Sequence, residues 1–325
     1  MRCGPPRGRG KGQRPRRLTA RGVLVECPSF ERAPPGQGQS DPMEEVRIAS
    51  VPFVNAQPLT WGFLRGPYRG IFRVRQVPPC RIPDLLRSGE ADIGLIPSIE
   101  YLGLPGVEFL PQLCIASKRR VRSVILVSLV PVETIRSVAL DANSRTSSAL
   151  LKTILWHKGV RDARYAEQPP SLREMLRDHD AALLIGDAAL TADTTGLFVL
   201  DLAAEWFALT GLPFVFAMWA VRGGVSVPDG VRPFLESRRI GMANVPAIAV
   251  QASVGLKLPP ESIESYLKTN IHYYLGSEER RGLELFFRQV QQLGLAPGRR
   301  PVRFRDPLEW ERVPAPSMPV RRAVE

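Results

Sequence analysis

Histidine, cysteine and long apolar runs are scarce in this sequence of 325 residues. Its three histidines, His157, His179 and His272, are far apart, and its four cysteines form no CxxC pair, so we expect no zinc site and no need for an oxidising compartment. No apolar run approaches the roughly 18 residues that a membrane span requires, and no secretory signal is readable, so the expected location is the cytoplasm. GxSxG, P-loop, HExxH and strand-associated GxGxxG motifs are also missing. Any catalysis must therefore depend mainly on positioning and polar contacts.

The positive charge of the chain is concentrated at its two ends. Residues 1–42 hold nine Lys/Arg against three Asp/Glu, and residues 299–325 hold seven against four, so the net charge of +12 falls to about +3 for the part between them. That part has no basic stripe interleaved with aromatic residues, and we expect neither nucleic acid nor a membrane as a partner. Residues 1–42 are predicted to be a disordered basic extension, or translated sequence upstream of a true start at Met43, with a nucleic-acid arm as the alternative. Residues 299–325 are predicted to be an irregular basic tail.

Short strand-like runs alternate with helical runs from Val46 onward, which predicts an α/β fold with a largely parallel sheet. Beyond Gly224 the pattern becomes helical. Strands are predicted at 47–51, 72–77, 93–96, 109–116, 121–128, 138–140, 164–166, 181–185, 197–201 and 213–220, and helices at 57–64, 82–88, 145–157, 172–177 and 202–209. Two later helical faces are expected, one formed by Tyr266, Asn270, Tyr273 and Tyr274 and the other by Leu283, Phe286, Phe287 and Val290.

Two alternating series followed by a helical return indicate two lobes with a ligand cleft between them. Residues 43–120 and 217–298 are expected to form lobe 1, and residues 121–216 are expected to form lobe 2, inserted into the first. The chain would cross between the lobes near 117–121 and near 214–219.

The most informative segment is SVALDANSRTSSALL at 137–151, in which an apolar strand runs directly into the first turn of a helix. Ser144 is a natural N-cap, and Arg145, Thr146 and Ser147 follow it. The first turn of a helix has unpaired backbone N–H groups and the positive end of the helix dipole, so it attracts an anion, and short hydroxyl side chains add donors. We expect a carboxylate or a phosphate here. The alternative is that these hydroxyls only cap the helix and satisfy a loop.

Three further polar residues follow predicted strands, and the carboxyl ends of strands are where α/β proteins usually bind ligands. Asn55 lies in SVPFVNAQPL and can both donate and accept hydrogen bonds, which suits a hydroxyl or an ether oxygen; its alternative role is a helix cap. Ser98 in DIGLIPSIEY is a candidate hydroxyl donor to the ligand. Ser117 in CIASKRRVRS is the third candidate, and it stands directly at a strand end.

Another candidate site follows the predicted strand 181–185. Gly186 would let the backbone approach a ligand closely, and the Asp187 carboxylate could orient a hydroxyl or accept a proton, although a cap for the helix from Ala188 onward is the more common role of such a residue. Phe214, with Phe216 and Trp219, could form the wall of a pocket for a planar ring. Aromatic residues in a central strand are also common in a plain hydrophobic core.

Six blocks of this sequence resemble the chorismate dehydratases of the futalosine route to menaquinone, and they occur in that family's order over about residues 46–292. The resemblance implies the two-lobed fold of the type II periplasmic binding proteins, with chorismate as the small-molecule partner. It also implies the removal of water from chorismate to give 3-[(1-carboxyvinyl)oxy]benzoate, without a metal or an organic cofactor. The six blocks are SVPFVNAQPL, GEADIGLIPSIEY, LCIASKRRVRSVIL, VALDANSRTSSALL, LLIGDAAL and EWFALTGLPFVFAMW.

The resemblance also implies roles for individual residues. Asn55 matches the asparagine of the family's first motif, Ser117 matches the serine that closes the IAS block, and residues 144–147 match the SRTS anion site. Our hypothesis is that Thr146 and the next serine hold one carboxylate, that Ser117 helps with the other, and that Asn55 orients the hydroxyl or the ether oxygen. The proton acceptor is either Asp187 or a carboxylate of the substrate itself.

Three alternatives stay open at this point. The same fold serves non-catalytic binding proteins for small carboxylates, and it serves the sister enzyme dihydroxynaphthoate synthase, whose opening motif differs from VPFVNAQPL. A ligand-sensing regulator would need a DNA-binding helix-turn-helix, which residues 1–42 cannot form. The oligomeric state is left open.

Overall fold

The computed structural model describes residues 45–298 and 300–305. The predictions for residues 1–42, and for residues 306–325 of the predicted tail, lie outside the described residues. Within the described part of the chain, strands alternate with helices as expected, and the α/β class is confirmed. No helix in this part is both long and apolar enough to cross a membrane.

The first sheet combines early strands with one late strand. Its strands are β1 (Val46–Ser50), β2 (Phe72–Gln76), β3 (Ile93–Pro97), β4 (Val107–Phe109), β5 (Ile115–Ser117) and β11 (Phe214–Arg222). The order is β2-β1-β3-β11-β4, and β5 also pairs with β11. Strand β1 is parallel to β2 and β3, whereas β11 is antiparallel to β3, β4 and β5. All five residues of β3 are buried, as is typical of a central strand that is covered on both faces.

The second sheet is formed by the middle of the chain. Its strands are β6 (Val124–Ser128), β7 (Ser137–Asp141), β8 (Arg164–Gln168), β9 (Ala181–Ile185) and β10 (Phe198–Asp201). The order is β10-β6-β9-β7-β8, in which β7 is parallel to β8 and β9 while β6 is antiparallel to β9 and β10. The prediction of a largely parallel sheet is therefore wrong, because both sheets are mixed. Strand direction depends on the partner that each strand meets, which local periodicity does not specify.

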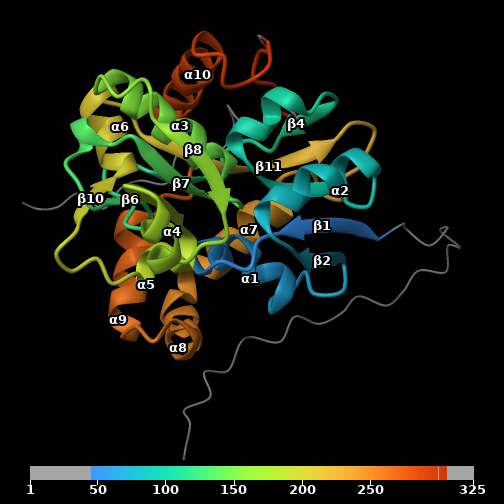
Figure 1. Cartoon of the computed structure of the whole chain (residues 1–325). Coiled ribbons are helices and arrows are strands. Elements are labelled where there is room, and N and C mark those ends of the chain that lie inside the picture. The colour runs from blue at the N-terminus through green and yellow to red at the C-terminus, as the bar shows by residue number, and fades with distance from the viewer. Residues whose placement is uncertain (1–44, 299, 306–325) are drawn as a thin grey trace, which may run out of the picture. The chain divides into compact units, whose positions relative to one another are not determined.

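Helices cover the two sheets (Figure 1). They are α1 (Gln57–Leu64), α2 (Ile82–Ser88), α3 (Arg145–His157), α4 (Leu172–Asp178), α5 (Gly186–Thr191), α6 (Leu202–Thr210), α7 (Arg232–Ala243), α8 (Val245–Leu256), α9 (Pro260–Ser265) and α10 (Ser277–Gln292). Prolines 58 and 83 lie in the first turns of α1 and α2, where the missing N–H would have no intrahelical partner. The predicted face of α10 is confirmed, because Leu283, Phe286, Phe287 and Val290 are buried.

The predicted single strand 109–116 is wrong. Strands β4 and β5 are separate and are joined by a turn that contains Pro111 and Gln112. The turn requires a left-handed backbone at Gln112, where φ is 62°. The sequence did not indicate this turn, because the residues on either side of it, Leu110 and Leu113, are apolar and buried like strand residues although they belong to no strand.

The predicted helical face around Tyr273 and Tyr274 is also wrong. Helix α9 continues into a π-helical turn at Tyr266–Asn270, after which the chain is extended. The extended part forms a bridge between His272 and Ala116 of β5. The backbone of this segment thus satisfies its hydrogen bonds with a strand that lies far away in the sequence.

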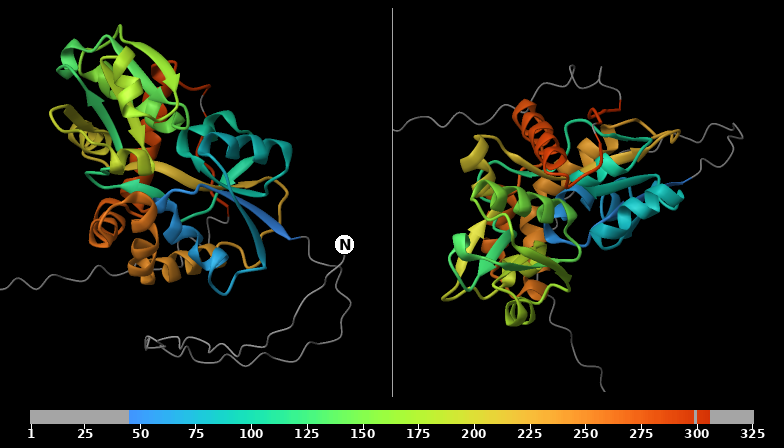
Figure 2. Two further views of the ribbon diagram at one scale, coloured as in Figure 1. Left: turned by 60° about the horizontal axis from the view of Figure 1, so that its bottom comes forward. Right: turned by 45° about the horizontal axis from the view of Figure 1, so that its top comes forward.

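The chain passes from the first sheet to the second between β5 and β6, and it returns between α6 and β11. The strands of the two sheets form separate groups in Figure 2. The larger cluster of buried apolar side chains nevertheless contains residues from both sheets, whereas a smaller cluster belongs to the second sheet with α4 and α5. The division into two lobes at 120/121 and 216/217 stays a prediction.

Candidate functional site

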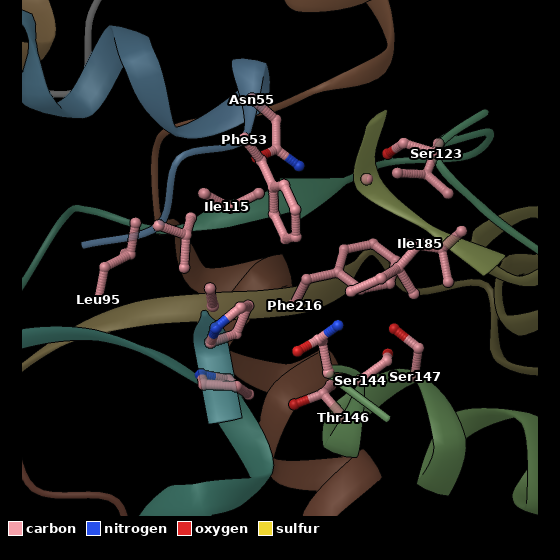
Figure 3. A pocket seen from close by; sticks show the side chains of 18 of the residues that line it. Phe53, Asn55, Leu95, Ile115, Ser123, Ser144, Thr146, Ser147, Ile185 and Phe216 are labelled. Carbon is pink, nitrogen blue, oxygen red and sulfur yellow. The ribbon is translucent and has the colours of Figure 1, made fainter. Parts of the chain in front are cut away.

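A cavity of about 620 Å³, including its open mouth, is lined by residues from both sheets. Strands β3, β5 and β11 contribute from the first sheet, and β6, β9 and the start of α3 contribute from the second. Its polar lining residues are Asn55, Ser123, Asn143, Ser144, Arg145, Thr146 and Ser147. Asn55 and Ser123 lie on one side in Figure 3, the hydroxyls of α3 lie on the opposite side, and apolar side chains lie between them.

The α3 side of the cavity is the segment that the sequence singled out. Ser144 occupies the N-cap position, as predicted, but its side chain makes no capping hydrogen bond. The Thr146 hydroxyl oxygen accepts a hydrogen bond from the backbone N–H of Ile99 at 3.2 Å. Ser144, Thr146 and Ser147 are all buried and all line the cavity. This arrangement suits an anion better than simple capping, since the Ser144 hydroxyl is not used by its own helix.

Arg145 adds a positive charge at the rim of this side. Its guanidinium Nη1 lies 3.3 Å from Oε1 of Glu100, a buried carboxylate of the short helix at Ser98–Gly103. Burial raises the pKa of Glu100, and Arg145 partly offsets that rise. The ion pair joins the start of α3 to the segment that follows β3, so Arg145 connects elements of the two sheets as well as lining the cavity.

The opposite side carries an amide and a hydroxyl. The Asn55 side-chain oxygen Oδ1 is buried and has no hydrogen-bond partner among the described residues, while its backbone oxygen accepts a 2.9 Å hydrogen bond from the Tyr273 hydroxyl. The Ser123 Oγ accepts a 2.7 Å hydrogen bond from the Tyr266 hydroxyl. A buried amide oxygen without a partner is costly, so this side of the cavity is incomplete without a ligand or water that donates to it.

Apolar side chains separate the two polar sides. Phe53, Ile115, Ile185 and Phe216 line this middle zone, as Figure 3 shows. Gly186 lies beside them with φ at +57°, and a Cβ atom there would be 3.2 Å from the Phe53 ring. Glycine is therefore favoured for two reasons: the left-handed backbone and the close ring. The zone fits a flat, largely apolar body with polar groups at both ends.

Two predicted residues, Ser98 and Phe214, lie outside the set that lines the cavity. The Ser98 hydroxyl donates a 2.8 Å hydrogen bond to the backbone oxygen of Val215 and so ties the short helix after β3 to β11. Phe214 packs edge-on against Trp206 and Phe286 in the core. The neighbouring aromatic residue of β11, two positions later, is the one that faces the cavity.

Two more predicted residues, Ser117 and Asp187, also lie outside the lining set. Ser117 is buried at the end of β5, and its Oγ has no hydrogen-bond partner among the described residues. The Asp187 carboxylate accepts a 3.2 Å hydrogen bond from the backbone N–H of Val54, which ties α5 to the segment that carries Asn55. Burial raises the pKa of Asp187, and that hydrogen bond partly offsets the rise. The predicted roles of these side chains in binding or catalysis stay predictions.

Sequence reasoning missed Phe53, Ser123 and Tyr266. Phe53 lies inside a motif that had been noted only for its asparagine, and Ser123 closes a basic run that suggests a solvated loop. Tyr266 lies in a segment interpreted as an ordinary helical face. No local pattern marks the last two, because they become partners only across 143 positions of sequence.

Among the described residues, no cluster of three or more His, Cys, Asp or Glu side chains is arranged to hold a metal ion.

Comparisons with known proteins agree with the sequence resemblance. The family described as menaquinone biosynthesis matches residues 46–292 of this chain. The chorismate dehydratase of Thermus thermophilus is 34% identical over 243 residues, which are 69% of this chain and 88% of that relative.

Solved structures show the fold. A protein from Archaeoglobus fulgidus superimposes with a TM-score of 0.63 at 19% identity, over 77% of this chain and 98% of that one. The periplasmic aliphatic sulphonate binding protein of Escherichia coli gives a TM-score of 0.54 at 16% identity, over 78% of this chain and 89% of its own. The predicted periplasmic-binding-protein-like fold is thereby confirmed.

Proposed function

The chain belongs to the menaquinone biosynthesis family, and we propose that it is a chorismate dehydratase acting in the cytoplasm. The observation that carries this proposal is the similarity to the Thermus thermophilus chorismate dehydratase, which extends over 88% of that relative. The reaction removes water from chorismate to give 3-[(1-carboxyvinyl)oxy]benzoate. Chorismate is a ring with two carboxylates and one hydroxyl, and the cavity has an apolar middle between two polar sides.

One carboxylate would lie at the start of α3. Thr146 and Ser147 would donate from their hydroxyls, and the first-turn amides and the helix dipole would add attraction for negative charge. Because Thr146 already accepts a hydrogen bond from Ile99, its own proton is available to the ligand. Arg145 would contribute a longer-range charge, since its guanidinium is paired with Glu100.

The polar groups near Asn55 would hold the other end of the substrate. Asn55 would orient the C4 hydroxyl or the ether oxygen, and Ser123 takes the place that the sequence suggested for Ser117, because Ser123 lines the cavity. The ring would lie between Phe53 and Phe216. These contacts would fix the geometry of the reacting carbons and exclude water, which are the main tasks when the product is aromatic.

In the elimination, the C3–H bond breaks, a C3–C4 double bond forms, and the C4–O bond breaks to release water. The C3 proton needs an acceptor. Asp187 is outside the residues that line the cavity, and its carboxylate already accepts from Val54. This geometry favours a carboxylate of the substrate itself as the acceptor, with the proton then passing to the departing hydroxide.

The proposal is tested by mixing the purified protein with chorismate. We expect the absorbance of the ring diene to disappear and mass spectrometry to find a product lighter by one water. Recovery of unchanged chorismate from a tight complex would contradict the proposal and support a solute-binding protein. Absence of both turnover and binding would exclude chorismate as the substrate.

A further inference from the structure

The contact between Tyr266 and Ser123 is not explained by ordinary packing. Tyr266 is 1% exposed and lies at the first position of the π-helical turn at Tyr266–Asn270. Its hydroxyl donates a 2.7 Å hydrogen bond to the Ser123 Oγ. π-Helical turns are rare and are found frequently at functional sites. Here the turn places the buried hydroxyl of Tyr266 beside Ser123, which lines the cavity.

The backbone around Ser123 is held rigidly. The N–H groups of Val121 and Arg122 donate to the Asp201 carboxylate at 3.1 and 2.7 Å, and the Ser123 carbonyl accepts from Gly186 at 2.7 Å. Arg122 has a φ of 63°, a left-handed conformation that is strained in a residue other than glycine. A strained and fully bonded backbone leaves rotation about the Cα–Cβ bond as the main remaining freedom of the Ser123 hydroxyl.

Tyr266 restricts that freedom. A serine hydroxyl has one proton to donate and lone pairs that accept, and here the phenol supplies the donor. No other protein group among the described residues accepts the Ser123 proton. That proton must then point to a group inside the cavity.

We propose that Tyr266 is a positioning residue that fixes Ser123 as a hydrogen-bond donor to an anionic oxygen of the bound aromatic or pre-aromatic dicarboxylate. This inference rests on the proposed function for the identity of the substrate. Thr146 is arranged by the same principle on the opposite side, where the Ile99 N–H occupies its oxygen. Each side of the cavity then presents a hydroxyl whose oxygen already accepts one hydrogen bond from the protein and whose proton is free to donate, so that negative oxygens are favoured at both ends of the ligand.

The Tyr266 phenol is protonated at neutral pH and is therefore able to donate. Burial raises the pKa of Tyr266, and side-chain hydrogen bonds with Ser123 and Asn55 partly offset the rise.

The test is a double-mutant cycle on the full-length protein with Tyr266→Phe, Ser123→Ala and the combined variant. Affinity for isophthalate, an aromatic dicarboxylate, is measured by calorimetry, and kcat and KM are measured with chorismate. Each single change should weaken isophthalate binding about tenfold, because hydrogen bonds to charged groups are worth roughly that much. The combined variant should be no weaker than Ser123→Ala, because isophthalate lacks the hydroxyl and ether oxygens assigned to Asn55, so the hydrogen bond between Tyr266 and Asn55 should not affect its binding.

The matched control is Tyr101→Phe. Tyr101 is a fully buried tyrosine that does not line the cavity, and its hydroxyl bonds to the backbone of residues 301 and 303. Its loss should leave isophthalate affinity unchanged. Thermal melting of every variant separates loss of fold from loss of binding.

The inference would be overturned if the loss of isophthalate affinity in the combined variant equalled the product of the two single losses. Unchanged affinity in Tyr266→Phe would overturn it as well. If Tyr266→Phe did not fold, wild-type affinity in Ser123→Ala alone would still overturn it. If the wild-type protein bound isophthalate but did not turn over chorismate, the proposed function would be rejected. The double-mutant cycle on isophthalate affinity would still test the role of Tyr266. Absence of both in the wild-type protein would reject both proposals.

Discussion

At the scale of single residues, the site depends on which hydrogen-bond partners the protein gives to its hydroxyl groups. Thr146 and Thr153 lie on the same helix, and both are buried. The Thr153 hydroxyl donates to the backbone oxygen of Ala149, one turn earlier in its own helix. The Thr146 oxygen instead accepts from Ile99 in another element, which leaves its proton to face the cavity. The same residue type thus has different chemistry because of its partner.

This contrast leads to a first prediction. Thr146→Val keeps the shape but removes the donor, and it should raise KM for chorismate about tenfold because a charge-assisted hydrogen bond to the carboxylate is lost. It should also lower the free energy of unfolding by about 1–3 kcal/mol, since the buried Ile99 N–H loses its acceptor. Steady-state kinetics and chemical denaturation measure the two effects. Thr153→Val is the control, and an equal rise of KM in both variants would show that Thr146 has no specific role.

A second prediction concerns Asn55. Asn55→Ala should lower kcat by about 100-fold, which is typical for loss of one polar group that stabilises a developing charge. It should have a small effect on the melting temperature, because the Asn55 Oδ1 has no partner among the described residues, the Tyr273 hydrogen bond goes to the backbone, and the change removes only the side-chain hydrogen bond with Tyr266. Asn244→Ala is the control, since the Asn244 amide bonds only within its helix end at Ile240. Wild-type turnover in Asn55→Ala would remove this residue from the mechanism.

At the scale of elements, one carboxylate fastens three strands of the first sheet. Asp92 directly precedes β3, and it accepts hydrogen bonds from the backbone and guanidinium of Arg47 in β1 and from the guanidinium of Arg222 in β11. Burial alone would raise the pKa of Asp92, but the hydrogen bonds from the two arginines outweigh it and lower the pKa to about 2. The ionised form is therefore the one that holds β1, β3 and β11 in place.

The acid stability of the protein should reflect these hydrogen bonds to Asp92. Because the folded-state pKa of Asp92 is below its ordinary value of 3.8, its stabilising effect is complete above about pH 4 and is lost as the pH falls toward 2. Asp92→Asn should lower the free energy of unfolding at pH 7 by about 1–2 kcal/mol, a modest amount because both guanidinium groups are partly exposed. Urea denaturation at several pH values should find the difference shrinking below pH 4. Asp84→Asn, which removes an exposed carboxylate, should have no such profile.

At the scale of the whole described region, the two sheets share most of their core. The larger apolar cluster includes side chains from β3 and β11 of the first sheet and from β6, β7 and α3 of the second. Two sheets that share a core should unfold together. We expect a single calorimetric transition in which the van't Hoff and calorimetric enthalpies agree.

Ligand binding should raise the temperature of that one transition. Isophthalate or the reaction product at 100 times its dissociation constant should add about 2.7 kcal/mol to the free energy of unfolding, because only the folded protein has the cavity. Scanning calorimetry with and without ligand measures the shift. Two separate transitions, with only one of them moved by ligand, would show that the predicted lobes fold independently.

The sequence by itself determined most of the elements and one side of the site. Helices α1 and α2 and strand β9 begin and end where periodicity and proline placement predict. The start of α3, which we propose binds an anion, was readable because strand, N-cap and first-turn hydroxyls are neighbours in the chain, and each acts within a few residues. The family resemblance came from the same local motifs, and the comparisons bear it out.

Only the tertiary structure decided how strands pair and which side chains complete the cavity. The antiparallel course of β11, the hydrogen bond between Asp187 and Val54 across 133 positions and the contact between Tyr266 and Ser123 across 143 positions leave no local pattern. Ser117 and Phe214 are in the right strands, but they lie outside the lining of the cavity. The physical reason is that capping and periodicity are short-range, whereas a cavity exists only where distant segments pack together and leave space between their side chains.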